Sequence, residues 1–272
     1  MPACMRGCGC TSTLCAQPLS APAYSSHAPR CGRSCSAYSG DSPRAVAPPL
    51  QMNKTPTTGE PPNFDRLAHI YRWGELVTFG PWLHRCRCAL LDSLSDRRRA
   101  LVLGDGDGRF TARLLRGNLD LEIDAVDASS AMLNELLRRA GASAGRIHTY
   151  CVDARHWRPP TPPYNLVVSH FFLDCLTQEE VEYLAGNLSG SISRHGHWLI
   201  SEFAIPSNFY GRFFARPLVF GLYWAFGRLT GLKVRTLPDH RTALNQSGFE
   251  LIVERRWLGG LLVSELWSMN RK

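Results

Sequence analysis

The chain has 272 residues, of which 44% are hydrophobic, and its formal net charge is +8. This length suits one α/β domain with an appendage. The hydrophobic fraction is high enough for a packed core, which excludes a wholly disordered protein. The basic residues stand in short groups, at 97–99, 138–139 and 255–256. Such groups are typical of solvated helix ends, so no nucleic acid is expected as a partner.

Residues 1–60 differ in composition from the rest of the chain. They hold six of the ten cysteines and eight of the eighteen prolines, with no helical or strand period. This composition predicts a disordered tail, followed by a folded domain over residues 61–272. The cysteines lack paired Cys-x-x-Cys spacing, and no apolar run suits a signal peptide, so neither a metal site nor export is expected. An alternative to a disordered tail is that translation begins at Met52, so that residues 1–51 are absent from the native protein.

The first predicted strand runs into three alternating glycines. The apolar run 100–103 is typical of a buried parallel strand, and Gly104, Gly106 and Gly108 follow it. Glycines let a backbone turn tightly and approach a ligand closely. The alternative is a glycine-rich turn that binds no ligand. Arg109 stands where a dinucleotide fingerprint has its third glycine, so S-adenosylmethionine is favoured over nicotinamide or flavin cofactors.

Acidic residues end two of the following predicted strands. The segment 121–127 ends in Asp127, about 20 residues past the glycines, where a carboxylate can accept both ribose hydroxyls. Ser129 or Ser130 is expected to cap the next helix. The strand at 147–153 ends in Asp153, and further strands are predicted at 164–170 and 198–203. Such acids meet at one edge of a doubly wound sheet, although capping and loop solvation can also explain them.

The end of the fourth predicted strand offers two candidate catalytic residues. His170 can accept a proton at neutral pH, and Asp174 is a second candidate base. The alternatives are a structural histidine at a strand end and an aspartate that caps the helix after Thr177. Base methyltransferases that act on amino groups carry an Asn/Asp-Pro-Pro-aromatic turn here, and its absence argues against amino-group methylation.

An aromatic insertion follows the fifth predicted strand. Its rings are Phe203, Phe209, Tyr210, Phe213, Phe214, Phe220, Tyr223, Trp224 and Phe226. Their near-helical spacing predicts one or two helices over an acceptor pocket, or else ordinary core packing. The uncharged run 217–227 is too short to span a membrane, but it could lie on a bilayer surface. The cations expected at the headgroups are Arg212, Arg216, Arg228, Lys233 and Arg235.

Taken in order, these motifs resemble the class I S-adenosylmethionine-dependent methyltransferases, and among them the C-methyltransferases of ubiquinone and menaquinone biosynthesis. The similarity covers residues 64–267. Its signatures are an entry segment, the second-strand run 126–133, the fifth-strand exit 202–206, and the closing hairpin formed by 244–250 and 259–263. The entry segment comprises 64–68, Tyr71, 79–80 and the helix at 85–87. The resemblance implies a doubly wound, mostly parallel seven-stranded sheet, an N-terminal helical cap and a helical insertion after the fifth strand.

The resemblance also implies roles for individual residues. The expected cofactor-binding residues are Tyr71, Gly104, Asp105, Gly106, Gly108, Asp127, Ala128, Asp153, Ala154 and Ser169. Asp127 would hold the ribose, Ala128 would lie against the adenine, and the glycines would wrap the methionine part. The family's acid two residues before the first glycine is replaced by Val102, for which Asp105 or Asp107 would have to substitute. The segment 227–240 also departs from the family, so substrate choice is expected to differ.

The expected function is methyl transfer from S-adenosylmethionine, by direct displacement and without a metal. The acceptor would be small and hydrophobic or aromatic, such as a quinol or an isoprenoid-linked ring. Cys86, Cys88, Cys151 and Cys175 suit a reducing cytosol, so the protein is expected in the cytoplasm, with the inner membrane face as a peripheral contact. Two alternatives stay open: a nucleic-acid or protein methyltransferase, and a degenerate methyltransferase fold that serves as an assembly partner.

Overall fold

The computed structural model describes residues 79–160, 163–230, 234 and 236–270. The chain divides into two units, Met1–Pro56 and Thr57–Lys272, and the described residues all belong to the second. The predicted tail, the alternative start at Met52 and the cap residue Tyr71 lie outside the described residues.

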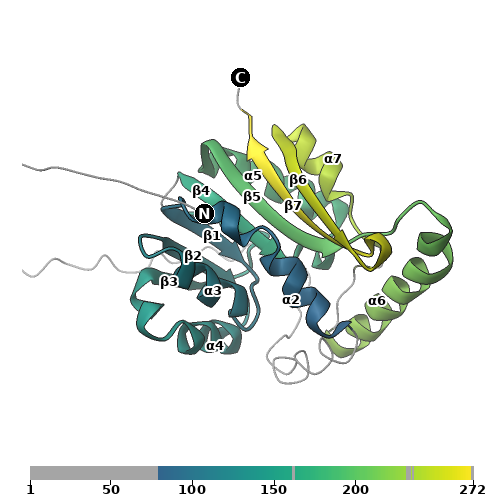
Figure 1. Ribbon diagram of the computed structural model, residues 1–272, viewed down its shortest axis with the longest axis horizontal. Coiled ribbons are helices and arrows are strands. Elements are labelled where there is room, and N and C mark those ends of the chain that lie inside the picture. The colour runs from purple at the N-terminus through teal and green to yellow at the C-terminus, as the bar shows by residue number, and fades with distance from the viewer. Residues whose placement is uncertain (1–78, 161–162, 231–233, 235, 271–272) are drawn as a thin grey trace, which may run out of the picture. The chain divides into compact units, whose positions relative to one another are not determined.

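A seven-stranded sheet forms the centre of this unit (Figure 1). Its strand order is β3-β2-β1-β4-β5-β7-β6, with β1 to β5 parallel and β7 antiparallel to both of its neighbours. The expectation of a mostly parallel seven-stranded sheet is therefore confirmed, with a mixed edge. The strands are β1 (Arg99–Leu103), β2 (Glu122–Asp127), β3 (Ile147–Cys151), β4 (Tyr164–His170), β5 (Ile192–Phe203), β6 (Phe249–Trp257) and β7 (Leu262–Met269).

Helices cover both faces of the sheet. The α-helices are α2 (Pro81–Cys88), α3 (Arg109–Gly117), α4 (Ser130–Ala140), α5 (Gln178–Ser191), α6 (Arg216–Thr230) and α7 (His240–Gln246). Short 3-10 turns lie at Leu91–Leu94, Gly141–Arg146, Leu173–Cys175 and Leu258–Gly260, and a π-helical turn at Gly211–Ala215 leads into α6. Among the described residues, no helix combines the length and apolar character needed to cross a bilayer.

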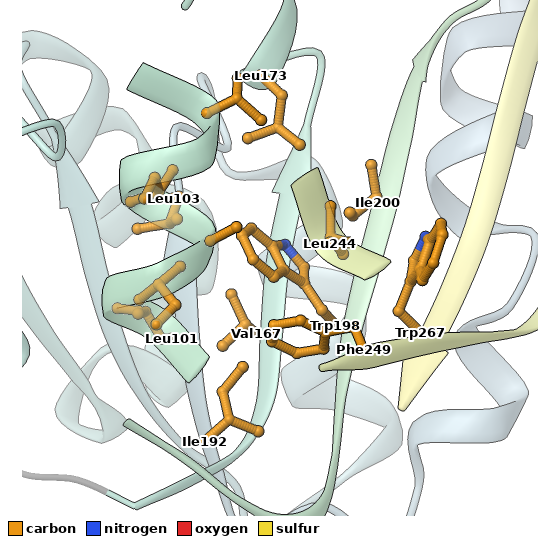
Figure 2. Packing of buried hydrophobic residues seen from close by; sticks show 14 of the residues in the cluster. Leu101, Leu103, Val167, Leu173, Ile192, Trp198, Ile200, Leu244, Phe249 and Trp267 are labelled. Carbon is orange, nitrogen blue, oxygen red and sulfur yellow. The ribbon is translucent and has the colours of Figure 1, made fainter. Parts of the chain in front are cut away.

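The sheet separates two hydrophobic clusters because successive strand residues point to opposite faces. Leu101 and Leu103 of β1 join Trp198 of β5 in the cluster beneath α5 and α7 (Figure 2). Ala100 and Val102 point the other way, into the cluster beneath α3 and α4. A strand buried on both faces reads as a continuous apolar run, which is why β1 was predictable from sequence.

A third cluster lies where β4 and β5 end. It joins Phe79, Phe171 and Phe203 with Ala215 of the π-helical turn and Val219 of α6. The spacing of the aromatic residues after β5 predicted that their rings contact an acceptor pocket or the core. For three of these rings the prediction is wrong. Phe213, Phe220 and Trp224 are 55%, 64% and 64% exposed, because Ala215 and Val219 form the buried side of this segment instead.

Candidate cofactor and acceptor site

The glycine turn between β1 and α3 adopts backbone angles that favour glycine. Gly104, Gly106 and Gly108 have φ of 60°, 61° and 74°. A Cβ on Gly108 would lie 2.6 Å from the Leu136 Cα of α4, and one on Gly104 would lie 2.6 Å from Cδ2 of Phe172. At Gly106 a Cβ would meet no described atom within 4 Å. The first and third glycines therefore serve packing within the protein, while Gly106 leaves the backbone open to a ligand.

Asp105, between the first two glycines, is a buried carboxyl group. Its Oδ2 accepts the backbone N–H of Thr111 at 2.9 Å, which satisfies one donor in the first turn of α3. Its Oδ1 is buried with no hydrogen-bond partner among the described residues. Burial raises the pKa of Asp105 to about 6. An incompletely satisfied carboxyl group beside the open Gly106 is suited to receive a donor from a ligand.

The residues proposed to replace the family's missing acid differ in their surroundings. Val102 is 1% exposed and belongs to the core beneath α3 and α4, so its side chain does not reach the turn's surface. The Asp107 carboxylate forms ion pairs with Arg109 at 2.8 Å and Arg139 at 3.2 Å. Asp105 is therefore the better placed substitute of the two.

Asp127 lies directly beside the glycine turn. The backbone N–H of Gly104 donates to the carbonyl of Val126, the preceding residue, at 2.9 Å. Asp127 Oδ1 accepts the backbone N–H of Ser129, and Ser129 Oγ accepts that of Met132 as the cap of α4. One turn thus fixes both the carboxylate and the helix start, and Ser129 rather than Ser130 is the cap.

Asp153 lies next to Asp127 at the sheet edge, since Val152 donates its backbone N–H to the Asp127 carbonyl at 3.1 Å. Although burial opposes ionisation, hydrogen bonds from Arg155 hold the pKa of Asp153 below its usual value. Nearby, Ala128 is exposed and Ala154 is buried. The structure thus brings the predicted ribose and adenine residues together at the ends of β2 and β3.

Ser169 and His170 point to opposite faces of β4. Ser169 is fully buried, and its Oγ accepts the Trp198 indole N–H at 3.0 Å, so its side chain serves the core beneath α5. The expected contact of Ser169 with the cofactor is therefore left to its backbone and stays a prediction. His170 is 3% exposed and packs edge-on against Phe110, with ring centroids 4.3 Å apart.

The His170 ring is neutral at physiological pH. Burial, followed by the nearby charge of Arg87, lowers its pKa well below 6.5. Neither ring nitrogen has a hydrogen-bond partner among the described residues. His170 can therefore accept a hydrogen bond or a proton, but only from a group that enters this buried region.

Glu202, at the end of β5, is a candidate functional residue that the sequence reasoning did not assign. It is 1% exposed, and its Oε1 accepts the backbone N–H groups of Phe172 and Leu173 at 3.1 and 2.8 Å. Its Oε2 has no partner within the described residues. Burial and the nearby carboxyl of Asp174 raise the pKa of Glu202 well above its usual value. The sequence signal that could have identified Glu202 is its position as an acidic residue at the otherwise apolar end of a strand.

Asp174 shares a narrow crevice with Glu202. Burial raises the pKa of Asp174 to about 6. The alternative that Asp174 caps the next helix is wrong, because Thr177 caps α5 in a reciprocal capping box with Glu180. A separate hollow of about 300 Å³, which His240 also lines, lies where β5 ends and β7 begins, and its volume suits a small molecule.

The comparison with protein families agrees with this geometry. Residues 100–196 match a family model described as a methyltransferase domain. A search of curated proteins gives no significant match. The matched segment carries the glycine turn, Asp127, Asp153 and His170, which are the residues that position the candidate site.

Solved structures share the fold at low sequence identity. The mitomycin 7-O-methyltransferase MmcR is 13% identical with a TM-score of 0.56, over 76% of this chain and 60% of its own. The S-adenosylmethionine-dependent methyltransferase SibL is 20% identical with a TM-score of 0.55, over 79% and 64%. The N-methyltransferase NodS from Bradyrhizobium japonicum WM9, in complex with S-adenosyl-L-homocysteine, is 15% identical with a TM-score of 0.53, over 75% and 99%.

These likenesses establish the architecture, and they do not single out the ubiquinone and menaquinone branch. The chain spans only about three fifths of the length of MmcR and SibL. Residues 100–196 are thus similar to a methyltransferase domain, and the chain shares its fold with SibL and with NodS, whose structure holds S-adenosyl-L-homocysteine.

Proposed function

We propose that the protein transfers a methyl group from S-adenosylmethionine to a small apolar or aromatic acceptor, such as a quinol or an isoprenoid-linked ring. The observation that carries this proposal is the open backbone at Gly106 beside the fixed carboxylate of Asp127. That pairing offers a nucleoside ligand a close backbone approach and an acceptor for ribose hydroxyls at one sheet edge.

The residues at this edge fit the methyl donor. Asp127 would accept the ribose hydroxyls, and the buried Oδ1 of Asp105 would accept a donor from the methionine part. Ala128 and Asp153 would border the adenine. When bound, the donor supplies a methyl group activated by its sulfonium. The protein's share is to hold the two reactants in line and to exclude water, and such positioning can account for about 7 to 11 kcal/mol of a barrier.

An apolar acceptor is favoured by the rings beyond β4 and β5. Phe203 lies between Phe79 and Phe171, with centroid distances of 5.3 and 5.1 Å. Tyr223 of α6 donates its hydroxyl hydrogen to the backbone carbonyl of Asp174 at 2.7 Å, which ties the helix to this region. Phe203 also lines the crevice that Asp174 and Glu202 share, and a ring beside a few polar groups is typical of small-molecule sites.

Asp174 is the better candidate for the general base. Its pKa of about 6 keeps it ionised yet able to accept a proton near neutral pH, whereas the more deeply buried His170 has a pKa well below 6.5. Burial and the carboxyl of Asp174 raise the pKa of Glu202 well above its usual value, so the two carboxyl groups titrate as a pair. Asp174→Asn should then remove the acidic limb of the pH–rate profile, and His170→Asn should leave that limb in place.

The experiment that tests the function follows a radiolabelled methyl group. The purified chain is incubated with labelled S-adenosylmethionine and, separately, a lipid extract, nucleic acid and a protein mixture. Label in a solvent-extractable product, reduced at least tenfold in Asp127→Asn, is the expected result. Label in macromolecules alone would favour a nucleic-acid or protein methyltransferase. Cofactor binding without transfer to any of the three would favour the assembly-partner alternative, which the apolar Val102 keeps open.

A further inference from the structure

The segment from Phe209 through Trp224 exposes an unusual concentration of large apolar side chains. Of the ten such side chains that are exposed among the described residues, six lie here: Phe209, Phe213, Phe214, Leu218, Phe220 and Trp224. We call these six residues the aromatic face. Monomeric proteins rarely expose contiguous apolar patches of this kind unless the patch binds something.

The aromatic face points outward because the residues on the other side of the same segment are packed against the rest of the protein. Ala215 and Val219 are 0% and 4% exposed in the cluster beyond β4 and β5. Tyr223 is anchored by its hydrogen bond to the Asp174 carbonyl. The helix cannot rotate to bury its outer rings without giving up these contacts. These contacts therefore fix the orientation of the segment, and the exposed rings face away from the acceptor region.

Among the described residues of this segment, the charged side chains beside the aromatic face are all arginines. Arg212, Arg216 and Arg228 are exposed, and the chain carries no Asp or Glu from residue 203 to 238. The Arg228 guanidinium lies over the Trp224 ring, 5.6 Å from its centroid. Aromatic rings that enter the acyl boundary, edged by arginines at headgroup level, are typical of helices that lie in a membrane interface.

From this combination we infer that the aromatic face docks on the surface of a bilayer containing anionic lipids. The helix α6 has 15 residues, so it would lie in the interface plane and not span the bilayer. Self-association through the same face would bring its arginines together, whereas an anionic surface neutralises them. This inference stands apart from the proposed methyl transfer, because it rests on a surface that no site residue shares.

Vesicle flotation tests the inference with the full chain. Wild type should float with phosphatidylcholine vesicles that contain phosphatidylglycerol, and much less with phosphatidylcholine alone. Phe213→Ser combined with Trp224→Ser should reduce binding at least tenfold. The matched control is Leu119→Ser combined with Ile252→Ser, which removes two exposed apolar side chains elsewhere and should bind like wild type. Arg212→Gln should weaken binding about fivefold on anionic vesicles, since one basic residue near the surface contributes about 1 kcal/mol.

Several results would overturn the inference. One is equal flotation of the wild type and the Phe213/Trp224 variant, and another is no flotation with either vesicle. A third is a monomer–dimer equilibrium in sedimentation that the Phe213/Trp224 variant abolishes without any effect of vesicles, since it would assign the face to a second copy. Thermal unfolding of each variant should stay near wild type, because all five substituted side chains are exposed.

Discussion

Three buried polar side chains with unsatisfied atoms lie near the carboxyl edge of the sheet. Asp105 Oδ1, Glu202 Oε2 and both nitrogens of His170 lack partners among the described residues. Leaving such groups unpaired costs about 1 to 3 kcal/mol each, so a fold gains nothing from them by itself. Their gathering around the glycine turn and the ends of β4 and β5 is the pattern expected where a polar ligand completes the hydrogen bonds.

The raised pKa of Asp105 predicts a pH-dependent contribution to stability. With a folded-state pKa of about 6, above its ordinary 3.8, the group binds a proton more tightly in the native state. Its contribution is therefore present at pH below about 3.8 and is lost as pH rises through about 6. Asp105→Asn mimics the protonated form. We expect its unfolding free energy to exceed that of wild type at pH 7.5 by up to about 3 kcal/mol.

Urea unfolding at pH 5 and pH 7.5 measures this difference. The gain from Asp105→Asn should shrink at the lower pH, where wild-type Asp105 is largely protonated. Asp120→Asn serves as the control, because Asp120 is a 68% exposed partner of Arg98 and should show no comparable change. A pH-independent difference between Asp105→Asn and wild type would show that the carboxyl group ionises normally in the folded protein.

At the scale of elements, the βαβ unit around the glycine turn was the most predictable part of the chain. The apolar run of β1, the acid at Asp127 and the cap at Ser129 each carry a local signal, and all three appear where expected. The direction of α6 was not predictable, because helical spacing shows that rings share a face without showing which face is buried. That choice depended on Ala215 and Val219, small enough to pack closely on the sheet edge.

Because Gly106 is the open position in the turn, a side chain there should weaken ligand binding strongly and lower the stability of the fold only a little. In Gly106→Val the Cβ meets no described atom within 4 Å, so the cost to folding is backbone strain of about 1 to 2 kcal/mol. The affinity for S-adenosylhomocysteine should fall at least tenfold, because the branched side chain fills the cradle. Gly141→Val is the control: Gly141 has φ of 57° and no described atom within 4 Å of a Cβ, and it caps α4 at the end opposite Ser129. Equal affinity losses in both variants, or in neither, would contradict the assignment of Gly106.

For the molecule as a whole, the sequence predicted the architecture better than the site. Strand patterns and glycine spacing are local, and together they determined the sheet and the edge where residues meet. Glu202 and Asp174 lie 28 positions apart, and their shared crevice depends on the ends of β4 and β5 lying side by side. Likewise, only the folded structure reveals that Ser169 faces Trp198 and that Phe172 covers Gly104.

The central claim is that Gly106 and Asp127 form the binding site of S-adenosylmethionine. Titration calorimetry with wild type and Asp127→Asn tests it most directly, since asparagine keeps an oxygen for the Ser129 N–H and removes the charge. The account predicts saturable one-to-one binding by wild type and at least tenfold weaker binding by the variant, a difference of about 1.4 kcal/mol. Absence of binding to folded wild type at millimolar cofactor, or equal affinity of the two proteins, would contradict it.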